Sequence, residues 1–506
     1  MLIFLQVVTI AGMLGATFFV YQALGPRRAD LTFSREDKRD LDELTRTNLG
    51  TWLTMANVFA SLTSLATVYV FFIGNLNAFG GWIFASIVTM WLGAFVTNRF
   101  TGAILRRPHI AERLSGPDQS SALLPALFLD GTPEAELTAR MVRWVTLVNI
   151  FVILWLEFAV FADVSSRLVG LGSPLAGAGM LFVCAFVVIL FTLRFGLRGF
   201  VLADLFHSPL IVLGTIALLI GAAAVIASPL AHVGGAADVG ALLAQARSIL
   251  KTPRLPIVGG ILFCISCLFL NAFLVLVTQP HWLRMWIFEA KETRYQVRSL
   301  TLTCLVWSLL IAVGVLAAIV ASLSGHGDME ANEVVVFFLQ KISNDGSPAF
   351  AIAFWVAGMA ALFSSSDAQI YSFALIERFD CRQGRVPSAA LNRIQPVLYA
   401  LAAASVFALL YWVMRAVRAP FDQIVLVLLP SCLIIVPPFI FAVRGLRQIP
   451  AITALTIAAY TILALLGLRP GQAGQLCAVA APVAPLVISL FALFAKPKEV
   501  MLESAN

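Results

Sequence analysis

Long apolar runs recur along the whole chain, and each is followed by a short polar stretch. About 20 helical residues, rising about 1.5 Å each, cross the hydrocarbon core of a bilayer. The pattern therefore predicts an all-α polytopic membrane protein with about 13 transmembrane helices. The expected spans are 1–24, 51–74, 81–101, 139–166, 175–193, 200–228, 256–278, 299–322, 348–374, 394–414, 422–442, 449–467 and 474–495.

The polar connections are too short for a second folded domain. The longest, 25–50, 102–138 and 229–255, have room for short surface helices, and 330–343 has the pattern of one more amphipathic helix outside the membrane. Residues 1–24 lack a basic start and a small-residue cleavage site, so we expect a first helix there and not a leader. We therefore expect one membrane domain over residues 1–506.

Composition narrows the function classes. Hydrophobic residues make up 60% of the 506-residue chain and charged residues 12%, whereas soluble domains carry about 25% charged residues. This balance disfavours a soluble enzyme, a nucleic-acid binder and a secreted disulfide scaffold. Six of the seven cysteines lie in or beside apolar runs, which predicts buried free thiols. We expect no enzymatic activity and no cofactor.

The distribution of basic residues predicts the orientation. If the N-terminus is outside and the thirteen spans alternate, 26 of the 34 Lys and Arg residues fall on inner loops and flanks, Arg284 among them. Basic residues are retained on the cytoplasmic side during insertion. We therefore expect a multi-pass protein of the plasma (inner) membrane with its N-terminus outside and its C-terminus in the cytoplasm.

Four stretches carry polar residues in an order that recurs in one transporter family. They are LGTWLTMANVFASLTS at 49–64, FTLRFGLRGFVLADLFHS at 191–208, TQPHWLRMWIFEAKE at 278–292 and GMAALFSSSDAQIYS at 358–372.

Together these stretches resemble the sodium/solute symporters, which include galactose, proline and sialic acid carriers. The first is similar to an LG-x-W start leading to A-x-x-x-S, the third to Q-P-H-x-x-x-R, and the fourth to A-A-x-M-S-S-x-D-S-Q. In the second, Asp204 matches the family aspartate, while Ala203 and His207 replace Thr and Gln of the pattern. The resemblance spans residues 49–372.

The resemblance implies a leucine-transporter-like core of two inverted five-helix repeats. They would occupy 51–228 and 256–442, after a leading helix and cytoplasmic loop at 1–50 and before two extra helices at 449–495. In such folds the first helix of each repeat is interrupted near the midplane, which exposes backbone carbonyls to a cation.

The resemblance also implies a sodium site between the first core helix and the serine-rich helix. Its ligands would be the carbonyls of Ala60, Thr63 and Ala361 and the hydroxyls of Ser364 and Ser365. Sodium, a hard cation, prefers such oxygen ligands. An alignment on Gly74 would move the first-helix ligands to Ser64 and Thr67. Without the resemblance, small hydroxyl residues are equally explained as helix-packing residues.

Two aspartates are expected on the ion pathway. The resemblance makes Asp204 part of the cytoplasmic exit route for sodium, within reach of the serines. The alternative is a helix cap, since a carboxylate in a first helical turn interacts well with the helix dipole. Asp367 either serves the same route or bonds a neighbouring helix.

Three polar residues are candidates for the substrate pocket. Glu157 lies deep in span 139–166, where a carboxylate costs roughly 2.5–3.5 kcal/mol and marks a pathway or a pair. We expect it to contact a substrate amine or carry a proton; a structural pair or a neutral carboxyl is the alternative. Asn271, in the sixth core helix, and Ser64, in the first, complete the set.

The sequence thus predicts a secondary transporter in which sodium is the coupling ion for symport of a small organic solute into the cell. The alternatives are a proton-coupled or sodium-independent carrier, or a membrane sensor with the same fold that moves no solute. A small membrane partner subunit is compatible with the second alternative.

Overall fold

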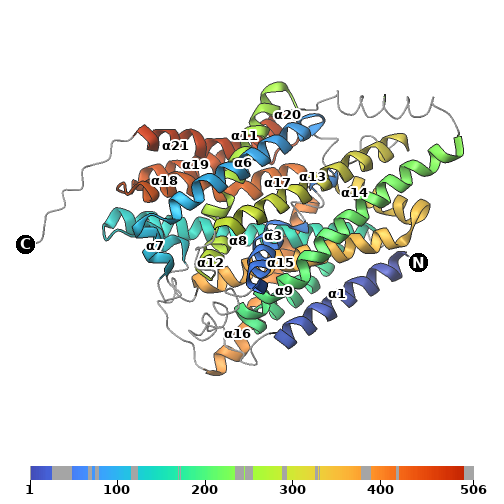
Figure 1. Ribbon diagram of the computed structural model, residues 1–506, viewed down its shortest axis with the longest axis horizontal. Helices are drawn as coiled ribbons and strands as arrows, with labels where there is room; N and C mark the ends of the chain where they lie inside the picture. The colour runs from blue at the N-terminus through green and yellow to red at the C-terminus, as the bar shows by residue number, and fades with distance from the viewer. Residues whose placement is uncertain are drawn as a thin grey trace, which may run out of the picture.

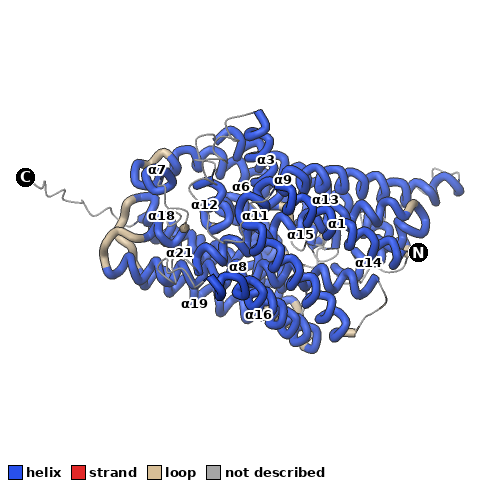
Figure 2. The backbone as a smooth tube through the Cα atoms, turned by 90° about the horizontal axis from the view of Figure 1, so that it is seen from below, coloured by secondary structure: helices blue, strands red, loops and turns tan. Residues whose placement is uncertain are grey.

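A computed structural model describes most of the chain. The described residues are 2–24, 48–65, 71–74, 79–115, 123–168, 170, 173–233, 244, 255–287, 293–324, 329, 331–377, 389–417 and 421–494. Within these ranges the ordered elements are all helical and form one elongated bundle (Figures 1 and 2).

The described helices match the predicted spans closely. Eleven are long and apolar enough to cross a membrane, and they coincide with the last eleven of the thirteen predicted segments. Of the first two predicted segments, 1–24 contains an apolar helix and 51–74 contains an interrupted helix. The first half of the chain holds α1 (Leu2–Leu24), α3 (Asn48–Leu62), α4 (Phe71–Gly74), α6 (Trp82–Leu105), α7 (Pro108–Ser115), η3 (Leu124–Phe128), α8 (Pro133–Leu168) and α9 (Pro174–Val233).

The second half repeats the order of long helices and adds two more. It holds α11 (Ile257–Val277), α12 (Gln279–Ile287), α13 (Thr293–Leu323), α14 (Ala331–Lys341), η4 (Ile342–Gly346), α15 (Pro348–Ile376), α16 (Ala389–Ala416), α17 (Phe421–Leu428), η6 (Leu429–Ile435), α18 (Val436–Arg444), α19 (Pro450–Gly467), α20 (Gln472–Ala480), η7 (Ala481–Val483) and α21 (Ala484–Phe494).

Residues Pro174–Val233 are assigned to one helical element, α9, which contains two apolar segments, Pro174–Arg194 and Val201–Ile226, that match the predicted spans 175–193 and 200–228. A straight helix of 60 residues would be about 90 Å long, three times a bilayer core. Thr17 contacts His207, and its neighbour Phe18 contacts Phe191 with ring centroids 5.1 Å apart. Two residues 16 positions apart on α9 thus lie beside adjacent residues of α1. The chain therefore reverses direction between them, and α9 supplies two membrane spans.

Each half of the core begins with an interrupted helix. The first half has α3, which ends at Leu62 and is followed by the non-helical residues Thr63 and Ser64. In the second half the backbone is extended at Thr278, with φ −116° and ψ 134°, between α11 and α12. Non-helical backbone at membrane depth survives only where it is buried or lines a cavity. Both interruptions were predicted from the resemblance, and both are present.

Small residues bring the central helices together. A β-carbon on Gly214 of α9 would lie 2.4 Å from the β-carbon of Ala357 on α15, and one on Gly93 of α6 would lie 2.6 Å from the Leu268 carbonyl oxygen of α11. Close approach of this kind is the usual means of helix association in lipid. Large apolar side chains such as Phe95 and Leu213 remain exposed, as expected of a lipid-facing surface.

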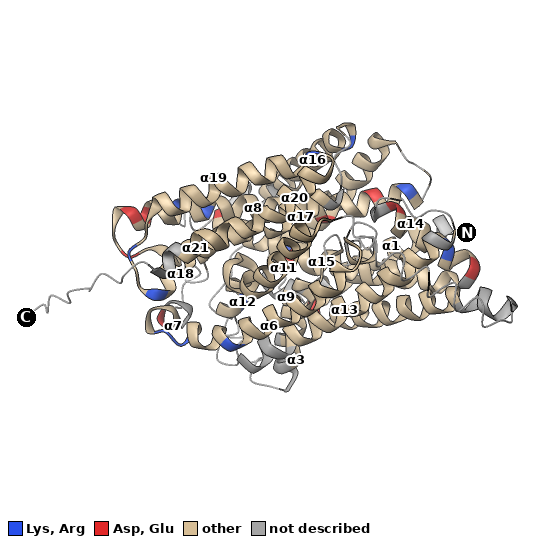
Figure 3. Ribbon diagram, turned by 90° about the horizontal axis from the view of Figure 1, so that it is seen from above, with Lys and Arg blue, Asp and Glu red and all other residues tan. Residues whose placement is uncertain are grey.

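Charged residues of the described chain gather at the two ends of the bundle, and few lie in its middle (Figure 3). The start of α1 and the short helix α14 lie at one end, whereas α7 and α21 lie at the other (Figure 1). Helices α7 and α14 confirm the short helices expected in 102–138 and 330–343. The bundle is that of a multi-pass membrane protein.

Candidate functional site

The interruption of the first core helix is held by two neighbouring helices. The carboxylate of Glu157, fully buried on α8, accepts a 2.9 Å hydrogen bond from the backbone N–H of Leu65. On the other side, the Leu65 side chain lies against Gly358 of α15, where a β-carbon would approach it to 2.8 Å. The interruption therefore lies between α8 and α15.

The last turn of α3 exposes backbone oxygens at this point. The Ala60 carbonyl accepts a 3.2 Å bond from the Thr63 N–H, and the Thr63 hydroxyl donates to the Phe59 carbonyl at 3.1 Å. A carbonyl oxygen has two lone pairs, so each of these acceptors keeps capacity for a second partner.

One turn of α15 carries four consecutive buried polar residues at 364–367. Ser364 donates a 2.5 Å hydrogen bond to Oδ1 of Asp204, and Ser365 donates to the Leu362 carbonyl at 3.3 Å. Asp367 accepts a hydrogen bond from Thr192 of α9, while its other oxygen has no hydrogen-bond partner in the described chain. Asp367 thus bonds a neighbouring helix, one of the two roles expected for it.

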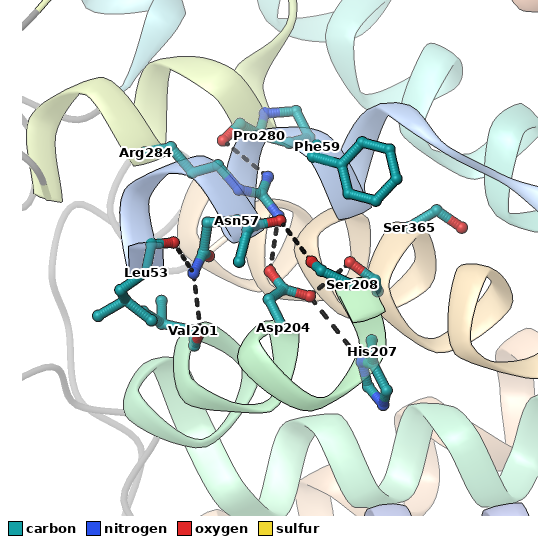
Figure 4. Close-up of polar contacts among 12 residues, drawn as sticks. Leu53, Asn57, Phe59, Val201, Asp204, His207, Ser208, Pro280, Arg284 and Ser365 are labelled. Atoms are coloured by element: carbon teal, nitrogen blue, oxygen red, sulfur yellow. Dashed lines mark hydrogen bonds and ion pairs between the residues drawn. The ribbon is translucent and has the colours of Figure 1, made fainter. Parts of the chain in front are cut away.

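Asp204 is the centre of a buried charged cluster (Figure 4). Its Oδ2 lies 3.7 Å from Nη2 of Arg284 on α12, and its Oδ1 lies 3.9 Å from Nδ1 of His207, one turn further along α9. Arg284 is 1% exposed, so the pair is shielded from water. Asp204 lies near the start of the apolar segment Val201–Ile226 of α9, so the helix-capping role stays an alternative beside the ion-pathway role.

Two side chains tie α3 to α9 beside this cluster (Figure 4). Asn57 donates to the carbonyls of Leu53, at 3.2 Å, and Val201, at 2.7 Å. Ser208 donates to the Ala56 carbonyl at 3.0 Å. The ion-pathway aspartate and the end of the interrupted helix are therefore fixed relative to each other.

The predicted sodium ligands fall on two helices that pack together. Ala60 and Thr63 are at the end of α3, Ala361, Ser364 and Ser365 are in the middle of α15, all five are buried, and the two helices are in contact. Their assignment as ligands stays a prediction. Thr67, the alternative ligand, lies outside the described residues.

Asn271 lies on the wall of an apolar cavity next to the interruption. The space measures about 750 Å³, including the part open to solvent. Leu62 and Phe72, which flank the interruption, also line it. Ser64 and Glu157 are buried but are not among its lining residues. The predicted pocket residues are thus divided between the cavity and the interruption, and their role in substrate binding stays a prediction.

The position of Arg284 corrects a prediction. The charge count placed it among the basic residues of an inner loop, whereas the structure buries it in α12 against Asp204. The Asp204 carboxylate compensates the charge of Arg284 there, so the guanidinium does not need to be hydrated. The sequence signal was the stretch QPHWLR at 279–284, because hydropathy alone does not place an arginine that closely follows an interrupted helix.

Comparison with known proteins gives the fold. No protein-family model matches the chain, and no curated protein matches its sequence. A solved structure of a Na+-coupled sialic acid symporter, in a substrate-bound outward-open state, is similar over 98% of this chain and 99% of its own, with a TM-score of 0.65 and 15% identity.

A second solved structure, MhsT in complex with L-phenylalanine, is similar over 88% of this chain and 98% of its own. Its TM-score is 0.50 and its identity 17%. At these identities the likeness concerns the backbone, and it extends over nearly the whole length of all three chains. The chain therefore adopts the leucine-transporter-like fold that its sequence resemblance implies.

Proposed function

We propose that this protein is a secondary transporter that couples the inward flow of sodium to the uptake of a small organic solute by alternating access. The observation that carries the proposal is the polar cluster at the interruption, where the end of α3 packs against α15 and Ser364 of α15 bonds the buried Asp204. Apolar surroundings make such a cluster costly unless a cation or a proton uses it.

In this proposal sodium binds between the two helices and holds them together. The ligands are the carbonyls of Ala60, Thr63 and Ala361 and the hydroxyls of Ser364 and Ser365. Because Asp204 accepts the Ser364 hydrogen, it directs the serine oxygen lone pairs away from itself and offers a negative charge one step further along the exit route. By linkage, sodium and solute each raise the affinity for the other.

A sodium-independent carrier is the second candidate, and Arg284 favours it. The guanidinium already supplies a positive charge 3.7 Å from Asp204, and a ring nitrogen of His207 lies 3.9 Å from the same carboxylate. A carrier of this kind would keep the fold and use the cluster without a sodium ion.

Sodium-dependent stabilisation of the purified protein separates the two candidates. A ligand that binds the folded state raises its stability in proportion to the logarithm of its concentration over Kd. We expect sodium chloride, compared with choline chloride, to raise the unfolding temperature. Ser364→Ala and Ser365→Ala should each raise the sodium concentration needed by about tenfold, which is about 1.4 kcal/mol.

Ser366→Ala is the matched control, because this buried serine lies on the same turn and is not a predicted ligand. It should keep the wild-type sodium response. Reconstitution into proteoliposomes then asks whether a sodium gradient drives uptake. A wild-type protein that sodium does not stabilise, with uptake indifferent to the gradient, would support the sodium-independent carrier instead.

A further inference from the structure

The cavity beside the interruption has a wall that is almost entirely apolar. It is lined from both halves of the core by α3, α4, α6, α11, α13 and α17, with η6, η7 and α20 behind them. We infer that the transported solute is neutral and largely apolar, with one hydrogen-bond donor directed at Asn271. The inference rests on the proposed transport function, and it names the class of solute.

No described lining residue is Asp, Glu, Lys, Arg or His. An isolated charge is costly to bury unless it is paired. A solute with a net carboxylate or ammonium would find no side chain of opposite charge among the described residues of this wall.

The hydrogen-bonding groups of the wall are few, and most are already used. The Ser266 hydroxyl lies 2.9 Å from both the Leu262 and the Val479 carbonyl oxygens, to which it donates. The Asn271 amide nitrogen donates to the Cys267 carbonyl at 2.8 Å. The Asn271 side-chain oxygen has no donor among the described residues. Within the described chain the wall thus offers one acceptor without a partner, the Asn271 oxygen, and one donor without a partner, the Trp307 indole N–H, too few for the many hydroxyls of a sugar.

Aromatic rings supply much of the remaining surface. Phe72 and Trp307 lie with ring centroids 5.8 Å apart and tilted by 44°, and Phe263 stacks on Phe79 at 4.5 Å. Phe72, Phe263 and Trp307 all line the cavity, together with Met90. Such a wall favours a ring or a branched alkyl group, because aromatic partners add geometric preference to apolar burial.

A series of indoles tests the inference, since its members share one ring and differ in charge. Indole and indole-3-acetamide are neutral, L-tryptophan is a zwitterion, indole-3-acetate is an anion and tryptamine is a cation. Binding to the purified full-length protein is measured by thermal unfolding, in sodium and in choline, with D-glucose as the polar comparison. We expect the neutral pair to bind at least tenfold more tightly than any charged member.

Asn271→Leu tests the single acceptor. Wild-type protein should prefer indole over 1-methylindole, which lacks the N–H donor, by about tenfold, and the variant should bind both equally. Ser266→Ala is the control on the same helix, because its hydroxyl is committed within the protein; it should keep the wild-type preference.

Tighter binding of a charged indole or of glucose would overturn the inference. So would the absence of any shift with the neutral compounds up to about 10 mM, a concentration that already corresponds to very weak binding. These outcomes are independent of coupling. If the protein prefers neutral indoles and sodium has no influence on their binding, the solute class is supported and sodium coupling is contradicted. If sodium strengthens the binding of a charged solute, sodium coupling is supported and the solute class is contradicted.

Discussion

Asp204 and Arg284 form a charge pair that is almost completely removed from water. Taking one partner away from such a pair leaves the other charge buried and typically costs about 3–5 kcal/mol, whereas removing both costs much less. We expect Asp204→Asn and Arg284→Met each to lower the free energy of unfolding by about this amount. The double variant should be more stable than either single one, as measured by thermal unfolding in detergent.

The pair between Arg447 and Glu134 is the matched control, because both side chains are about half exposed. Solvent screens such pairs, so Arg447→Met should cost less than about 1 kcal/mol. If the Asp204 and Arg284 effects simply add in the double variant, the two groups do not stabilise each other and the cluster has another purpose.

Glu157 accepts the hydrogen bond from the Leu65 N–H at the interruption, and this contact makes a distinct prediction. Glu157→Gln keeps a side-chain oxygen that can accept the Leu65 N–H, so it should fold with nearly wild-type stability. Glu157→Ala leaves that buried N–H without its acceptor and should cost about 1–3 kcal/mol.

Thermal unfolding of the two variants decides the point. Equal losses in Glu157→Gln and Glu157→Ala would show that the charge matters more than the hydrogen bond. That result would return Glu157 to the role of a substrate-amine contact or proton site, which the sequence predicted.

At the residue scale, the sequence identified polar residues that lie on the same helix, but it did not identify which residues of other helices they contact. The serines of α15 and Asp204 were placed together only through the family resemblance, and the bond from Ser364 is consistent with it. Arg284 and Asn57 were missed as site residues because each acts on a partner far away in sequence. Hydropathy treats an arginine as a loop residue unless the compensating carboxylate is known.

At the scale of elements, glycine positions control how closely α9 and α15 approach. A β-carbon on Gly214 would meet Ala357 at 2.4 Å and the Ala353 carbonyl oxygen at 2.9 Å, so backbone would have to move. Overpacking of this kind costs about 1–3 kcal/mol. We expect Gly214→Ala to lower the unfolding temperature of the purified protein.

Gly179 is the control on the same helix. A β-carbon there meets nothing within 4 Å, and alanine is the better helix former. Gly179→Ala should therefore match or slightly exceed wild-type stability. Equal behaviour of both variants would mean that α9 and α15 separate easily, against the close contact described.

The lengths of the helices followed from hydropathy, but their interruptions did not. Residues 51–74 read as one apolar segment, because a non-helical turn needs no polar side chains when neighbouring helices satisfy its backbone. Glu157 does so for Leu65 from a helix about 90 residues away. The polar stretch after Arg194, by contrast, was predicted from hydropathy as the point where the chain reverses direction, and the two apolar segments of α9 lie on either side of it.

At the scale of the whole molecule, the odd number of predicted spans places the two chain termini on opposite sides of the membrane. The start of α1 and the last helix, α21, lie at opposite ends of the structure (Figure 1). The charge rule predicts which end faces the cytoplasm, because 25 of the 34 basic residues, leaving out the buried Arg284, fall on the side predicted to carry the loops 25–50 and 102–138.

Cysteine labelling on intact cells tests this orientation. Arg35→Cys and Ser120→Cys, in loops predicted inside, should resist a membrane-impermeant maleimide, and Ala241→Cys, predicted outside, should react. All three positions lie outside the described residues, so the test rests on the charge rule. Cys381 is replaced by Ser first, because the other six cysteines are buried or half-buried.

The labelling experiment includes a control and an outcome that would contradict the predicted orientation. Permeabilised cells should label all three positions, which shows that the thiols are present and reactive. Labelling at position 35 but not at position 241 in intact cells would invert the molecule. The cluster of Asp204 and Arg284 would then lie toward the outer side of the membrane. Sodium would pass this cluster as it enters the protein on its way to the serines, and not as it leaves. The direction of every proposed step would therefore be reversed.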